Sequence, residues 1–134
     1  MPVLKNFLFC LNTNNTNGTK NVTGILCAIS PEYVPGLYSF AVNFSVLDLA
    51  EGVHNFSLKF SNPNGELVTS IDNATVNYIK DRNSNLPDEY LGVNVAANFQ
   101  NVDIKISGLY SMDVILDGQS LQKVSVFVKG KNEK

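Results

Sequence analysis

Hydrophobic and polar residues alternate with a period of two along much of the chain. From Tyr38 to Val46, large apolar side chains occupy every second position, with small or polar residues between them. The same alternation groups Phe56, Leu58 and Phe60 on one side of a later segment. Because successive side chains of a strand point to opposite faces, the pattern is typical of strands that bury one face.

Turn residues, rather than helical segments, separate these runs. Asp117-Gly118 and the sequence from Asn62 to Gly65 are typical of hairpin turns. The stretch 12–21 has no large apolar side chain and predicts a loop around Asn17-Gly18, and 80–89 predicts a second loop. The predicted strands are 3–12, 22–30, 38–49, 53–60, 67–79 (one strand, or two interrupted near Asp72-Asn73), 91–99, 102–106, 110–116 and 121–128.

Seven to nine strands without intervening helices predict an all-β fold, an antiparallel sandwich of two sheets. The segment 3–12 is apolar on both faces and is expected to be a central strand. We predict a single β-sandwich domain over 1–129 and a charged C-terminal tail over 130–134.

Composition narrows the classes of function. The chain has 134 residues, 44% hydrophobic and 16% charged, and its 18 Asn make the polar surface largely neutral. With Arg82 as the single arginine and a net charge of -2, it lacks the basic patch of a nucleic-acid-binding protein. No apolar run is long enough to span a bilayer and no signal peptide precedes the first strand, so we expect a cytoplasmic protein without a membrane partner.

Cys10 and Cys27 are the only cysteines, too few for a four-ligand zinc site. If the first two strands form a hairpin centred near 17–19, Cys10 lies opposite Cys27 and a disulfide is within reach. We favour the alternative of two buried free thiols, because nothing indicates export.

His54 is the only histidine, so a catalytic base or triad would have to use it, with Ser57, Asp48 or Cys10 nearby. The spacing does not select these partners, and a half-buried imidazole at the rim is the favoured interpretation. We therefore expect no enzyme, and we assign no catalytic, cofactor-binding or metal-binding residue.

Acidic residues near the second predicted loop raise the question of calcium. Asp81, Asp88 and Glu89, joined by Asp72, offer oxygen ligands. The regular spacing of a calcium loop is missing, so a solvated acidic loop is the favoured interpretation.

Asn-x-Ser/Thr sequences are frequent, as expected by chance for a chain so rich in Asn and hydroxyl residues. Without a signal peptide they do not predict glycosylation. They begin at Asn14, Asn17, Asn21, Asn43, Asn55 and Asn73.

Two sets of motifs resemble known proteins. The run from Gly108 through Tyr110 to Met112 resembles the tyrosine corner of immunoglobulin-like sandwiches, with Met112 in place of a core cysteine. The segments 20–25, 52–54, 62–65 and 108–118 together resemble a family of small bacterial β-sandwich proteins of unknown function. These resemblances imply an immunoglobulin-like fold and no particular activity.

The expected function is a non-catalytic interaction or structural module that binds another protein or itself through sheet edges or turn loops. The alternative is a module for carbohydrate or another small ligand, held by Tyr33, Tyr78 or Tyr90. No cofactor is expected in either case.

Overall fold

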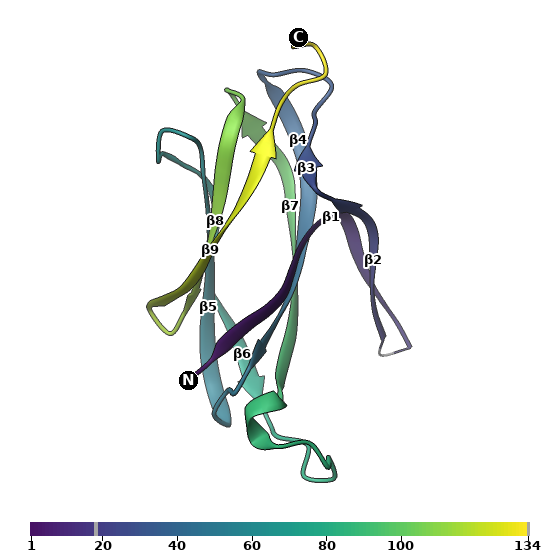
Figure 1. Cartoon of the computed structure of the whole chain (residues 1–134), viewed down its shortest axis with the longest axis vertical. Coiled ribbons are helices and arrows are strands. Elements are labelled where there is room, and N and C mark those ends of the chain that lie inside the picture. Colours follow the sequence, from purple (N-terminus) through teal and green to yellow (C-terminus); the bar gives the residue numbers. More distant parts are fainter. Residues whose placement is uncertain (18, 134) are drawn as a thin grey trace.

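The computed structural model describes residues 1–17 and 19–133, which form two packed β-sheets. Sheet A has the strand order β2-β1-β4-β7, and sheet B has the order β3-β9-β8-β5-β6. Figure 1 shows the two sheets as layers, with the two ends of the chain at opposite ends of the molecule. The described elements are β1 (Val3–Thr16), β2 (Thr19–Leu26), β3 (Ala28–Ile29), β4 (Gly36–Leu47), β5 (Gly52–Ser61), β6 (Leu67–Tyr78), the 3-10 turn η1 (Asp88–Tyr90), β7 (Gly92–Ile104), β8 (Gly108–Leu116) and β9 (Gln119–Val128).

The connections are those of an immunoglobulin-like sandwich. β4 pairs with β7 in one sheet, β5, β8 and β9 are neighbours in the other, and every pair is antiparallel except β3 with β9. The hydroxyl of Tyr110 donates a hydrogen bond to the carbonyl of Ile106 over 2.6 Å, closing the corner before β8. This is the tyrosine corner that the sequence motif predicted.

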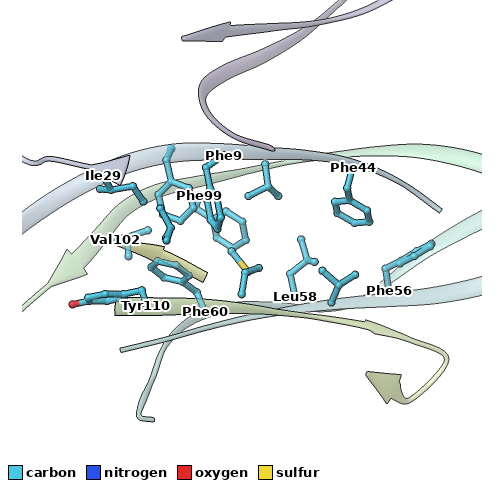
Figure 2. Packing of buried hydrophobic residues seen from close by; sticks show 14 of the residues in the cluster. Phe9, Ile29, Phe44, Phe56, Leu58, Phe60, Phe99, Val102 and Tyr110 are labelled. Carbon is cyan, nitrogen blue, oxygen red and sulfur yellow. The ribbon is translucent and has the colours of Figure 1, made fainter. Parts of the chain in front are cut away.

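Aromatic side chains from the two sheets meet in the core (Figure 2). The rings of Phe40 in β4 and Phe60 in β5 have centroids 5.1 Å apart, and Tyr110 stacks on Phe60 at 5.2 Å. Phe44 and Phe56 form a second contact at 6.2 Å. The inward face predicted from the alternation is therefore confirmed.

Two predicted interruptions are β-bulges within longer strands. Of the two alternatives for 67–79, the single strand is the one observed, and near Asp72-Asn73 β6 only changes register, with a φ of 54° at Asn73. The predicted strands 91–99 and 102–106 form one strand, β7, with a bulge at Asn101, whose φ is 53°. Asn adopts this left-handed conformation more readily than most residues, so it accommodates the extra residue of a bulge.

The loop predicted over 12–21 was wrong, because most of this stretch is a hairpin. β1 continues to Thr16, and β2 begins at Thr19 and pairs with it. Cross-strand backbone hydrogen bonds stabilise the hairpin although its side chains are polar, and Thr favours strands. Of the predicted Asn17-Gly18 turn, Gly18 lies outside the described residues.

The far part of this hairpin extends away from sheet A. Residues from Val3 to Cys10 pair with β4, whereas those after Cys10 pair only with β2. We call residues 11–17 and 19–24 the arm. Figure 1 shows the arm standing on the outer side of sheet A, away from sheet B.

The favoured prediction of two buried free thiols is confirmed for Cys10 and wrong for Cys27, which is free but exposed. The pairing of Thr16 with Thr19 places the hairpin axis one residue earlier than predicted, so Cys10 lies opposite Ile25 and not Cys27. Both cysteines are free, Cys10 is buried and Cys27 is exposed. A hairpin shifted by one residue moves every cross-strand partner by two, which separates the two thiols.

Candidate functional site

His54 lies between two acceptors and away from its proposed catalytic partners. Its Nδ1 is 2.7 Å from Asp117 Oδ2, and its Nε2 is 2.6 Å from the carbonyl of Ala50. Ser57 instead accepts a hydrogen bond from the backbone of Asn73, and Asp48 pairs with the amino group of Met1. The structure does not assemble the triad considered from the sequence.

The contacts of His54 favour its charged form. Both ring nitrogens face acceptors, and only the protonated imidazolium can donate from both. Hydrogen bonds to Asp117 and to the carbonyl of Ala50 raise the pKa of His54. The pKa of Asp117 is lowered, first by the backbone N–H of Asn55 and then by His54. This pair joins the start of β5 to the turn between β8 and β9.

Cys10 is poorly placed for nucleophilic chemistry. Its side chain is buried, and its Sγ lies 3.6 Å from the carbonyl of Ala41. Burial raises the pKa of the thiol. A nucleophilic cysteine needs the opposite change, because the thiolate is the reactive form.

The acidic residues near the second loop are dispersed. Asp88 pairs with Lys80 at 3.2 Å, Asp81 accepts a hydrogen bond from the backbone of Asn83, and Asp72 accepts one from Ser70 on β6. In the ranges 1–17 and 19–133, no group of three His, Cys, Asp or Glu side chains is arranged to hold a metal ion.

The three candidate tyrosines do not form one platform. Tyr78 is 6% exposed and belongs to the core. Tyr33, which precedes β4, and Tyr90, which lies near Leu47 where β4 ends, are exposed at opposite ends of the molecule. They are too far apart to contact the same small ligand.

Among the Asn-x-Ser/Thr sites, Asn43 is buried and exchanges two 3.0 Å hydrogen bonds with the side chain of Asn94. The other sites are exposed, and they are Asn14, Asn17, Asn21, Asn55 and Asn73.

The open edge of sheet A is formed by β7. The backbone N–H of Asp48 donates to the carbonyl of Leu91 over 2.9 Å, so the backbone groups of 91 point toward β4. The directions of the backbone N–H and C=O groups alternate from one residue to the next along an antiparallel strand. The N–H and C=O groups of residues 92, 94, 96 and 98 therefore point away from β4. Among residues 1–17 and 19–133 no strand pairs with them on that side, since β7 is the last strand of its sheet.

This edge differs from the others in charge. The edge strand β2 carries Lys20, and the part of β1 that β2 does not cover carries Lys5 and a bulge at Asn6. The edge strand β6 carries Asp72, and β9 carries Lys123 in the part that β3 does not cover. Charges and bulges of this kind normally prevent edge pairing. Residues 92–100 of β7 contain no charged residue and no proline.

Two contacts from the arm reach this edge. The hydroxyl of Thr13 lies 3.5 Å from the side-chain Oδ1 of Asn98. The ammonium group of Lys20 in β2 donates to the backbone carbonyl of Asn94, one of the outward-pointing groups. Leu8, Val22 and Asn43 line a hollow between the arm and the sheet beside this contact. Sequence reasoning missed both features. The uncharged run of β7 is visible in the sequence, but its edge position depends on strand order, which the sequence pattern does not reveal.

Comparisons with known proteins place the chain in context. Residues 5–129 match a family described as a family of unknown function, DUF6941, which confirms the resemblance to a sandwich family without an assigned role. The crystal structure of an immunoglobulin-like protein from Pseudomonas aeruginosa is similar over 96% of this chain and 97% of that chain, with 11% identity and a TM-score of 0.42. No curated protein matches the chain. Within the described residues, no helix has the length and apolar character needed to cross a membrane.

Proposed function

We propose that this chain, which belongs to the DUF6941 family of unknown function, is a non-catalytic module that binds another protein or a second copy of itself through the edge of β7. The observation that carries the proposal is the long, uncharged edge from 92 to 100, beyond which the described part of the chain places no further strand. Such an edge offers a row of backbone donors and acceptors to an incoming strand.

The side chains beside the edge favour the same interaction. Val93, Val95 and Ala97 point into the sandwich but are only half-buried. A strand added to β7 would cover their exposed parts, and burial of apolar surface stabilises the contact. Asn94, Ala96 and Asn98 lie on the outer face and bring no charge.

The candidate catalytic groups support a non-catalytic role. His54 is held between Asp117 and Ala50, where it links two elements of the fold. Cys10 is buried with a raised pKa. Both arrangements favour a structural role for these groups over a catalytic one.

Site-specific photo-crosslinking in cells that produce the protein tests the proposal. A photoreactive residue in place of Ala96, at the β7 edge, is expected to give covalent adducts with another protein or a second copy. The matched control replaces Ser125, which is exposed on β9. No adduct from position 96, or equal yields from both positions, would contradict the proposal.

A further inference from the structure

We infer that the edge of β7 binds the β7 edge of a second copy, antiparallel and with a two-fold axis at Ala96. The inference rests on the proposed function and names the partner and the register. Pairing about a two-fold axis is the usual arrangement of homodimers, because one surface then serves both copies.

The directions of the backbone groups limit the register. The outward-pointing groups belong to even-numbered residues, so an even-numbered residue must lie opposite another even-numbered residue. With the axis at Ala96, Asn94 lies opposite Asn98 of the second copy, and Gly92 lies opposite Gln100. This register pairs the whole uncharged stretch, which ends near the bulge at Asn101.

The side chains are self-complementary in this register. On the inner face, Val95 lies opposite Ala97 of the second copy and Val93 lies opposite Phe99. Apolar cross-strand pairs of this kind stabilise a sheet, whereas like charges placed opposite each other destabilise it. Because 92–100 has no charged side chain, two copies meet here without repulsion between charges in the ladder.

Lys20 competes with this pairing. Its ammonium group occupies the carbonyl of Asn94, which would accept a hydrogen bond from Asn98 of the second copy. Lys20 of the arm therefore hinders strand pairing at this edge, as lysines do on other edge strands. Dimerisation requires that Lys20 leave this carbonyl, so the dimer of the natural protein is weakened by the arm.

Disulfide trapping tests the register. In a Cys27→Ser background, Ala96→Cys places two thiols opposite each other across the axis, with Cα atoms about 5.5 Å apart, within the range for a disulfide. The matched control is Asn94→Cys, which lies on the same face and edge. Its two copies would be separated by four residues along the strands, about 13 Å, too far to bridge. Mild oxidation is expected to give a covalent dimer from Ala96→Cys and little from Asn94→Cys.

Sedimentation equilibrium tests the strength of the contact and the role of Lys20. Lys20→Ala is expected to tighten the dimer about 25-fold, since one competing hydrogen bond, worth about fivefold, is removed from each of the two copies. Lys123→Ala makes the same change in net charge on another strand and should leave the dissociation constant unchanged. Ala96→Pro removes an N–H that points away from β4, so it should preserve the fold and abolish the dimer.

The outcomes separate this inference from the proposed function. Monomers for both the natural chain and Lys20→Ala, or equal trapping of Ala96→Cys and Asn94→Cys, overturn the inference. A dimer that survives Ala96→Pro also overturns it, since the contact would then lie elsewhere. If photo-crosslinking at position 96 still captures a different protein, the proposed function stands although the second copy is the wrong partner.

Discussion

His54 and Asp117 form a charged pair whose contribution to the free energy of unfolding is lost at both high and low pH. Hydrogen bonding raises the pKa of His54 above its ordinary value of 6.5, so its contribution is complete below that pH and is lost as the pH rises through the raised pKa. The pKa of Asp117 lies below its ordinary 3.8, so its contribution is present above that pH and is lost as the pH falls through the lowered pKa.

The pair therefore predicts a stability maximum in weakly acidic solution. The free energy of unfolding of the natural chain should be higher near about pH 5.5 than near about pH 8.5 by less than about 1 kcal/mol, since Asp117 is half exposed and solvent screens the charge. Urea unfolding at the two pH values measures the difference. His54→Gln keeps a hydrogen-bonding side chain but cannot be protonated, and should lose this slope. An unchanged slope in that variant would contradict the assignment.

Element boundaries in this fold are set by backbone geometry as much as by the hydrophobic pattern. β7 begins at Gly92, which packs directly on β4. A Cβ added to Gly92 would lie 1.7 Å from the carbonyl oxygen of Val46, so no other residue fits without moving the strand. Gly65, in the turn after β5, has a φ of 80° but open space around its Cα.

A methyl group added at each of these two glycines is expected to lower the free energy of unfolding by a different amount. Gly92→Ala should reduce the free energy of unfolding by about 2 to 4 kcal/mol, because the strand pair must separate to relieve the overlap. Gly65→Ala should cost about 1 kcal/mol, from backbone strain alone. Denaturant titration of both variants measures the two effects. Equal losses would show that close packing at Gly92 does not limit the pairing of β4 with β7.

At the scale of the whole molecule, the two cysteines report on different motions. Cys27 is exposed, whereas Cys10 is buried and has a raised pKa. A thiol reagent should label Cys27 rapidly and Cys10 only when the fold opens. Mass spectrometry is expected to show one fast adduct and one slow adduct, and urea should accelerate only the slow one. Cys27→Ser should remove the fast phase, and fast labelling of Cys10 in that variant would contradict its burial.

Alternation along the chain was enough to predict the two sheets, because Phe40, Phe56 and Phe60 can be buried together only by stacked strands. The tyrosine corner at Tyr110 was also readable, since its hydrogen bond is local. The arm could not be predicted from the sequence, because its strands are stabilised by backbone pairing and their apolar residues do not alternate with polar ones. The β7 edge was missed for a related reason, since position within a sheet depends on contacts between distant segments.

The arm has a consequence for how this chain can vary. Beyond Leu11 its side chains are mostly exposed and none belongs to the core, so changes in its length or sequence cost the fold little. Peptides grafted there would be displayed beside β7 without disturbing the sandwich. A segment of this kind can acquire new specificity while the two sheets that carry it stay the same.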